Sequence, residues 1–235
     1  MRCLRQRVRC KQALKDDHKD DIRRDEMIAV IDYGVGNLFS LTASLKHVGA
    51  DAIVTGKAED LEAADKIILP GVGAFEDAIA KLRATGLVST LDEQVAKGKP
   101  LMGICLGMQL LFEKSYEYGE FDGLGYIKGS VISMREAEDP AKRVMPDTKV
   151  PQIGWNALHI VKDDVLTAPI KDGDHVYFVH GYYADECEDA IVAYTDYDVK
   201  VPAIVRQGSV CGTQFHPEKS GNVGLSILKG FVENA

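Results

Sequence analysis

The sequence lacks the features that mark several specialised classes of protein. No apolar run approaches the ~18 residues that a membrane-spanning helix needs. The basic excess of a nucleic-acid-binding protein is missing, since 28 Lys and Arg stand against 36 Asp and Glu and the net charge is −8. The five cysteines are odd in number and show no Cys-x-x-Cys spacing, so neither a disulfide framework nor a zinc site is indicated. These absences favour a soluble protein of a reducing compartment, and we expect it to be cytoplasmic.

Residues 1–26 differ in composition from the rest of the chain. They carry six basic residues before the first acidic one, Asp16, and then mixed charge with almost no apolar side chain. An Arg-rich, acid-poor segment is typical of organelle-targeting peptides, but the aspartates between 16 and 21 and the lack of serine count against that interpretation. Because such a segment cannot build a core, we expect a disordered charged tail over 1–26, or an upstream start before a true first residue at Met27.

From residue 27 onward, apolar runs alternate with helical patterns. The 46% hydrophobic content is enough to build a core. We expect strands at 27–31, 52–54, 66–69 and 101–104, and helices at 40–48, 75–84, 88–97 and 106–112. Strands at 127–134, 156–161, 175–179, 191–194, 203–206 and 209–214 should follow, with a closing helix at 223–232. The alternation predicts one α/β domain over 27–235, with a doubly wound, mostly parallel open sheet, flanking helices and a β-rich second half.

Gly34 and Gly36 follow the first predicted strand, as in the opening of a dinucleotide-binding fingerprint. Phe39 stands where that fingerprint needs its third glycine, so the Gly-x-Gly-x-x-Gly pattern fails. A tight turn is the better interpretation. Such a turn still lies at the edge of the sheet where ligands or partners bind.

Cys105 lies between two glycines in Gly103-Ile104-Cys105-Leu106-Gly107. An apolar segment precedes it and a helical pattern follows, which is the sequence form of a sharp strand-to-helix turn that exposes a nucleophile. A helix N-terminus also favours the thiolate, the reactive form of cysteine. The alternative is a buried core cysteine, and the flanking glycines together with His216 favour a nucleophile over it.

His216 should lie just beyond a strand, because it follows the apolar run that ends at Phe215. Pro217 fixes the local backbone, and Glu218 is two residues away from His216. This arrangement suits an imidazole base that a carboxylate orients. Of the other histidines (18, 47, 159, 175 and 180), none has this pattern, and Cys187 and Cys211 are interpreted as packing residues.

The loop Pro70-Gly71-Val72-Gly73 ends another predicted strand. Its glycines can aim backbone N–H groups at a developing oxyanion, with the N–H of Leu106 as a second donor, although a plain turn is an equal alternative. Gln109 and Glu113 are one and two turns after Cys105 on the same predicted helix face. They would hold the polar ends of an amino acid, or simply form a solvated face.

With these residues assembled, the chain resembles the class I, triad-type glutamine amidotransferases. The resemblance rests on Gly103-Ile104-Cys105-Leu106-Gly107-Met108-Gln109 and His216-Pro217-Glu218, and it covers residues 27–235. Three further segments resemble the glutaminase subunits of imidazole glycerol phosphate synthases: Asp32 to Leu38, Pro70 to Phe75 and Val150 to Asn156.

This resemblance implies a reaction and a partner. Cys105 would attack the amide of glutamine, His216 would transfer protons and Glu218 would hold the imidazole, with Gly73 and Leu106 at the oxyanion and Gly71, Gln109 and Glu113 at the substrate. The ammonia would pass to a (β/α)8-barrel cyclase subunit, forming a heterodimer that makes imidazole glycerol phosphate and aminoimidazole carboxamide ribotide in histidine biosynthesis. Asn37, Trp155 and Lys219 would lie at the partner interface. No cofactor, metal, nucleic acid or membrane is implied.

In this family the glutaminase has almost no activity until the cyclase binds its ligand, and we expect the loop from Pro70 to Gly73 to control this activity.

Two alternatives to this function stay open. One is another amidotransferase, such as the glutaminase of anthranilate or carbamoyl phosphate synthesis, against which Gly154-Trp155-Asn156 argues. The other is an idle α/β interaction subunit or a stand-alone cysteine hydrolase.

Overall fold

The computed structural model describes residues 26–235. The predicted tail therefore lies outside the described residues, except for Glu26, whose carboxylate bonds Lys66 at 2.7 Å. None of the described helices combines the length and the apolar character needed to cross a membrane.

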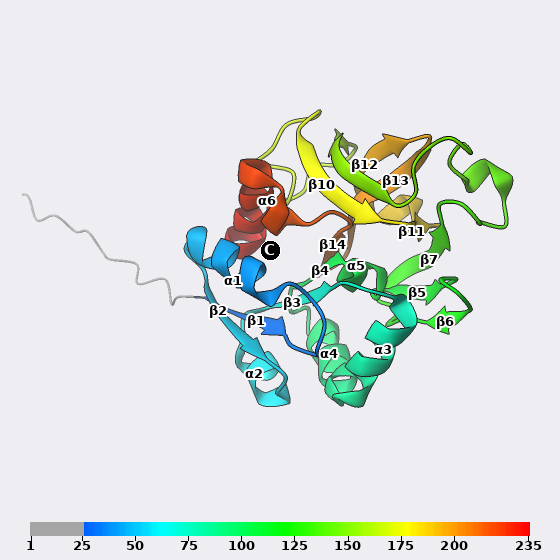
Figure 1. The fold of residues 1–235 in the computed structure, drawn as a ribbon. Coiled ribbons are helices and arrows are strands. Elements are labelled where there is room, and N and C mark those ends of the chain that lie inside the picture. Colours follow the sequence, from blue (N-terminus) through cyan, green and yellow to red (C-terminus); the bar gives the residue numbers. More distant parts are fainter. Residues whose placement is uncertain (1–25) are drawn as a thin grey trace, which may run out of the picture.

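An eight-stranded sheet forms the centre of the domain (Figure 1). Its strands, in spatial order, are β2 (Asp51–Thr55), β1 (Met27–Ile31), β3 (Lys66–Gly71), β4 (Leu101–Cys105), β14 (Val210–Thr213), β13 (Val199–Gln207), β12 (Ile191–Tyr197) and β9 (His159–Ile160). The first five are parallel and the last three are antiparallel extensions. β3 and β4 are buried along their whole length, as apolar runs of a doubly wound sheet should be. The predicted fold class is confirmed.

Helices cover both faces of this sheet, since alternate residues of each strand face opposite sides. The helices are α1 (Leu38–His47), α2 (Ala58–Ala63), α3 (Phe75–Ala84), α4 (Leu87–Ala96), α5 (Leu106–Gln109) and α6 (Gly221–Asn234). One apolar core joins Ile31 and Leu69 to α2, α3 and α4, and the other joins Val30 and Ile68 to α1 and α6. Figure 1 shows the two groups of helices on opposite sides of the strands.

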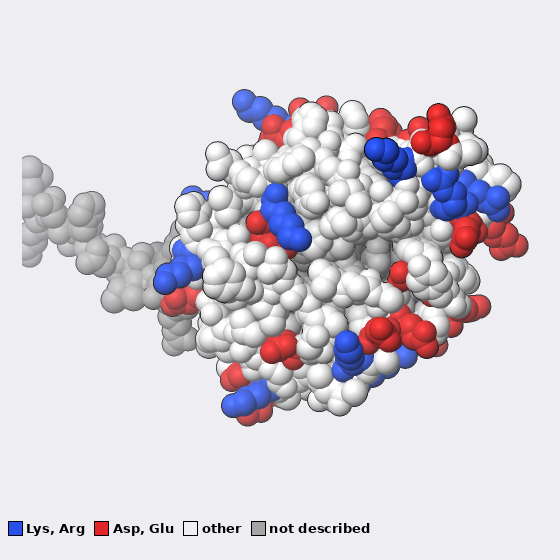
Figure 2. All heavy atoms as spheres, viewed as in Figure 1, with Lys and Arg blue, Asp and Glu red and all other residues white. Residues whose placement is uncertain are grey.

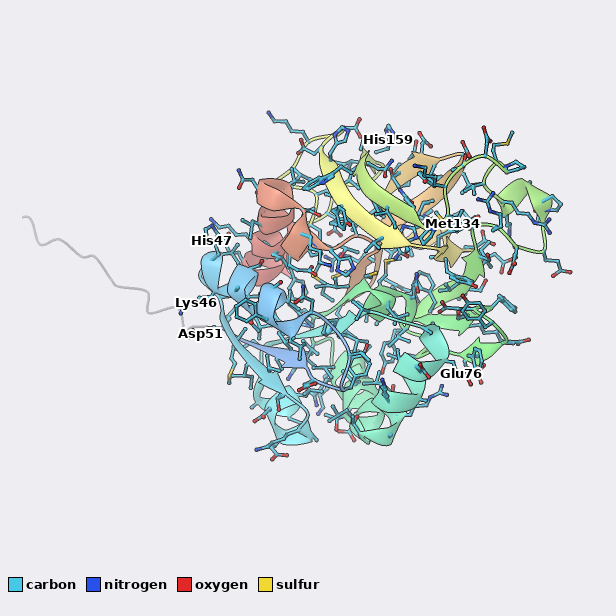
Figure 3. The ribbon with its side chains drawn as sticks, viewed as in Figure 1. Lys46, His47, Asp51, Glu76, Met134 and His159 are labelled. Carbon is cyan, nitrogen blue, oxygen red and sulfur yellow. The ribbon has the colours of Figure 1, made fainter. Side chains whose placement is uncertain are left out.

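Charges at the helix ends support these assignments. Lys46 and His47 occupy the last turn of α1, and Glu76 lies in the first turn of α3 (Figure 3). Basic residues at a helix C-terminus and acidic residues at its N-terminus both stabilise the helix dipole.

Two small sheets form the β-rich second half. One pairs β8 (Gln152–Ala157) with β10 (His175–His180), and the other has the order β11 (Tyr182–Asp185), β7 (Ile127–Ser133), β5 (Phe112–Ser115) and β6 (Phe121–Asp122). Three 3-10 turns complete the structure: η1 (Pro140–Lys142), η2 (Glu188–Ala190) and η3 (Pro217–Lys219). Met134, which follows β7, is fully buried in a third apolar cluster (Figure 3).

The helix predicted at 106–112 is wrong beyond its first turn. Leu110 and Leu111 are fully buried, and the carbonyl of Leu111 accepts hydrogen bonds from the N–H groups of Tyr126 and Ile127. A continued helix would direct that carbonyl to residue 115, so the contact with Tyr126 and Ile127 ends α5 and turns the chain into β5. The strand predicted at 156–161 is divided between β8 and β9, which belong to different sheets.

Candidate active site

Cys105 is the last residue of β4 and lies directly before α5. Its φ of 54° and ψ of −113° are outside the regions that non-glycine residues favour, so the backbone is strained at this position. The side chain is mostly buried but reaches the cavity described below. Because α5 is a single turn, the helical contribution at the sulfur comes from its first amide groups and not from a long dipole.

Close backbone contact between β3 and α5 explains the glycines of this turn. A Cβ on Gly107 would lie 1.9 Å from the carbonyl oxygen of Leu69, and a Cβ on Gly71 would lie 2.5 Å from the nitrogen of Gly107. Gly71 is also paired with Cys105 in the sheet register. The absence of two side chains therefore brings the end of β3 against the turn that presents Cys105.

His216, which caps η3, and Glu218 within η3 come together shortly after the end of β14. Nδ1 of His216 is 2.8 Å from Oε1 of Glu218, and both side chains are only 3% exposed. The His216 backbone is held as well, since its N–H donates to Tyr177 and its carbonyl accepts the Ser220 hydroxyl at 2.7 Å. With Nδ1 engaged by Glu218, the nitrogen left for chemistry is Nε2, which is buried without a hydrogen-bond partner within residues 26–235, and His216 lines the same cavity as Cys105.

The two partners of His216 change its affinity for a proton. Burial alone would lower the pKa of His216, but its interactions with the nearby Cys105 and with Glu218 outweigh burial and raise the pKa to about 9. The imidazole is therefore protonated at neutral pH. In such a pair a cysteine thiolate is the nucleophile, and the adjacent imidazolium can donate a proton to the leaving group.

An amide network surrounds the sulfur. Nε2 of Gln214 donates to Sγ of Cys105 at 3.9 Å, and Oε1 of Gln214 accepts from Nε2 of Gln109 at 3.1 Å. Gln109 also donates to the carbonyl of Tyr182, which is 2.9 Å from Nδ1 of His180. Since Gln109 uses its amide hydrogens in this network, the orientation of the Gln214 amide is fixed with its N–H groups toward the sulfur.

Cys105, Gln109 and His216 line a cavity of about 280 Å³. Its walls are Val72, Gly73, Cys105, Leu106, Gln109, Glu117, Val179, His180, Gly181, Tyr182, His216 and Lys219. The volume is at the lower end of ligand pockets, which suits a ligand the size of an amino acid. Figure 2 shows the face over the region labelled α5 and β14 in Figure 1: charged side chains gather mostly toward its rim and the centre is largely uncharged.

The structure corrects the prediction that Glu113 faces the substrate. Glu113 lies on β5, and its carboxylate accepts the N–H of Gly129 at 2.9 Å, outside the cavity. Glu117 is the carboxylate that lines the cavity instead, and its Oε2 accepts the N–H of Phe75 at 2.6 Å. Burial raises the pKa of Glu117, although the Phe75 N–H opposes this effect. The error follows from continuing the helical spacing past Gln109.

His180 was also missed as a residue of the site. It is buried at the end of β10, lines the cavity, and burial lowers its pKa to about 4, so it is neutral at physiological pH. Its Nε2 has no hydrogen-bond partner within residues 26–235. The only sequence signal is its position at the end of a strand. Cys187 and Cys211 are buried, and burial raises the pKa of each to about 12, as expected of packing residues.

Of the three residues predicted at a partner interface, Lys219 alone lines the cavity, from its position in η3. Trp155 lies on β8 with 53% exposure, and its ring is 3.9 Å from the Cβ position of Gly221, the first residue of α6. Asn37 caps α1 by accepting the N–H of Ser40 at 3.3 Å. Within residues 26–235, no group of three His, Cys, Asp or Glu side chains is placed to hold a metal ion.

Comparison with known proteins gives a consistent result. Residues 29–235 match the family model described as "Glutamine amidotransferase class-I". A protein named "Imidazole glycerol phosphate synthase subunit HisH" from Caldanaerobacter subterraneus subsp. tengcongensis is 48% identical over 208 residues, which are 88% of this chain and 98% of that protein. The protein of the same name from Methanothermobacter thermautotrophicus is 48% identical over 207 residues, with the same two coverages of 88% and 98%.

Among solved structures, the one described as "Structure of PurLQS from Thermotoga maritima" has a TM-score of 0.67 at 21% identity, covering 88% of this chain and 97% of that chain. At this level of identity the similarity concerns the fold.

Proposed function

The chain belongs to the class I glutamine amidotransferase family, and from this premise we propose that it is the glutaminase subunit of an imidazole glycerol phosphate synthase in histidine biosynthesis. The observation that carries the proposal is an amino-acid-sized cavity lined by the strained Cys105 and by His216, whose ring the buried Glu218 holds. The choice of histidine biosynthesis as the pathway rests on the relatives named HisH, which are 48% identical to this chain over nearly their whole length.

The reaction follows from the protonation states of the pair. The Cys105 thiolate attacks the side-chain carbonyl carbon of glutamine, and the negative charge moves to the carbonyl oxygen, within reach of the N–H groups of Leu106 and Gly73. The imidazolium of His216 gives its proton to the departing nitrogen, so the C–N bond breaks, ammonia leaves and a glutamyl thioester remains. The neutral imidazole then takes a proton from water, which attacks the thioester and releases glutamate. Glu218 keeps the ring in one orientation through both steps.

Glu117 and Gln109 are suited to select the amino-acid end of the substrate. Glu117 is half-buried, and burial raises its pKa. A nearby cation stabilises the charged form of such a carboxylate, and the α-ammonium group of glutamine is a cation. Gln109 is already fixed by Gln214 and the Tyr182 carbonyl, so it forms a rigid wall of the cavity.

The face around the cavity is suited to the partner. Phe39 on α1 is 84% exposed, and Ile153 and Trp155 on β8 are 61% and 53% exposed. α1 contacts η3, which carries the cavity residue Lys219, and the Trp155 ring lies 3.9 Å from the Cβ position of Gly221, two residues beyond Lys219. Exposed apolar side chains around a polar site mark a protein interface. We place the (β/α)8-barrel cyclase on this face, where ammonia leaving Cys105 reaches it directly and closes the imidazole ring of imidazole glycerol phosphate.

The loop after β3 is suited to control the rate of glutamine hydrolysis. Gly73 has a φ of +103° and nothing within 4 Å of its Cβ position, and Val72 is 40% exposed, so the local backbone has room to rotate. A rotation there adds or removes an oxyanion donor, and one donor is worth roughly 10²–10³ in rate.

The test is glutamine hydrolysis by the purified chain, alone and with a cyclase subunit and its ribotide ligand. The proposal expects slow hydrolysis alone and at least roughly 10²-fold stimulation by the ligand-bound cyclase. Cys105→Ala should abolish hydrolysis, while synthesis from free ammonia by the cyclase continues. Full activity without the cyclase would refute the control by the loop, and no hydrolysis under any condition would refute the function.

A further inference from the structure

Tyr33 connects the first strand to the loop that follows β3. It is the second residue after β1, is 5% exposed, and its hydroxyl donates to the carbonyl oxygen of Pro70 at 2.7 Å. A buried tyrosine hydroxyl needs a partner, and this one bonds the residue immediately before Gly71. The bond joins segments that are 37 residues apart in the chain.

The same turn contacts Pro70 a second time. A Cβ at Gly36 would lie 3.3 Å from the Cβ and Cγ atoms of Pro70, so the backbone of the turn packs against the proline ring. From the other side, Gly71 packs against the amide of Gly107 at the nucleophile turn. The peptide between Pro70 and Gly71 is therefore held on both sides, while Val72 and Gly73 beyond it are exposed.

The hydroxyl of Tyr33 stays a donor throughout the working pH range. Burial, followed by the charge of the nearby Cys105 thiolate, raises its pKa far above the ordinary value of tyrosine. Tyr33 does not line the cavity, so it acts on the reaction through Pro70 and not by touching glutamine.

We infer that Tyr33 is a positioning residue of the oxyanion hole, which anchors the Pro70 carbonyl so that rotation is confined to the peptides of Val72 and Gly73. The turn that carries Tyr33 runs directly into Asn37 and the exposed Phe39 of α1. A partner that contacts Phe39 is thus connected by a short stretch of chain to Tyr33, the residue that holds the oxyanion loop. This inference rests on the proposed glutaminase function.

The matched test compares Tyr33→Phe with Tyr183→Phe. Tyr183 is 3% exposed, and its hydroxyl also donates to a backbone carbonyl, that of Lys142 at 2.6 Å, but its ring packs in the third apolar cluster away from the cavity. With the cyclase and its ligand present, Tyr33→Phe should lower kcat roughly 10-fold, part of the value of one oxyanion donor, with KM for glutamine nearly unchanged. Tyr183→Phe should leave both constants nearly unchanged.

A second measurement does not depend on activity. Amide hydrogen exchange of the segment 67–75 should be faster in Tyr33→Phe than in the wild type, and unchanged in Tyr183→Phe. Equal kcat in the two variants, or equal exchange of this segment in both, would overturn the assignment. A wild-type chain without glutaminase activity would refute the proposed function instead, and the exchange comparison would still decide whether Tyr33 anchors the loop.

Discussion

The buried pair of His216 and Glu218 makes the stability of the protein depend on pH in a way that one substitution should remove. The folded-state pKa of His216 is about 9, above its ordinary value of 6.5. Between these pH values, folding therefore favours the protonated form of His216. The stabilisation is fully present below pH 6.5 and is lost as the pH rises through 9. Since one pH unit is worth about 1.4 kcal/mol, the pair with its Cys105 neighbour contributes about 3 kcal/mol to the free energy of unfolding.

Glu218→Gln removes the carboxylate charge and keeps an oxygen that can accept from Nδ1 of His216. Because Cys105 also raises the pKa of His216, the share that belongs to Glu218 is about 1–2 kcal/mol. We expect the variant to unfold more easily than the wild type by this amount at pH 6, and the difference to shrink toward zero above pH 9. Its kcat should fall roughly 10²-fold or more, since the imidazole loses its charge partner.

The assay is urea unfolding of both proteins at several pH values between 6 and 10. Glu233→Gln is the matched control, because Glu233 is exposed and lies 3.7 Å from Lys229 in a surface pair. Comparing the variants cancels the titration of the other groups, including the buried thiols. A difference that stays constant across this range would refute the reasoning, and so would a variant that keeps the kcat of the wild type.

Two further predictions concern the cavity and the nucleophile turn. Glu117→Gln should raise KM for glutamine about 10-fold or more with a smaller effect on kcat, whereas Glu113→Gln should change neither, as steady-state kinetics would measure. A larger rise in KM for Glu113→Gln than for Glu117→Gln would instead support Glu113 as the residue that binds the substrate. Gly71→Ala should destabilise the fold by about 2 kcal/mol or more in thermal or urea unfolding, because its Cβ would lie 2.5 Å from a backbone nitrogen. Gly98→Ala, where the φ is +81° and the space is open, should cost only about 1 kcal/mol, and an equal loss at both sites would argue against the close contact at the turn.

The sequence predicted the parts of the site that local chemistry specifies. Glycines on both sides of Cys105 are needed wherever a strand turns sharply into a helix against another strand, and the structure has that contact. His216, Pro217 and Glu218 are close in the chain, so two residues of spacing already place the carboxylate beside the imidazole. The parallel strands were predictable because a strand buried on both faces is a continuous apolar run.

The sequence did not predict contacts that depend on distant segments. The run from Leu106 to Leu111 fits a buried helix or a turn into a strand equally well, and the bonds to Leu111 from Tyr126 and Ile127 decide between them. Because the chain turns into β5 here, Glu117 lines the cavity and Glu113 does not. The bond between Tyr33 and Pro70 likewise joins two strand ends that nothing local relates.

The reaction of Cys105 with a glutamine-analogue electrophile tests the central claim most directly. The chain should be treated with 6-diazo-5-oxonorleucine, digested and sequenced by mass spectrometry, with excess glutamine as competitor. We expect one adduct on the peptide that contains Cys105, suppressed by glutamine and lost in Cys105→Ala. An unmodified Cys105, or labelling of Cys187 or Cys211 at the same rate, would contradict a glutamine-specific nucleophile at the end of β4.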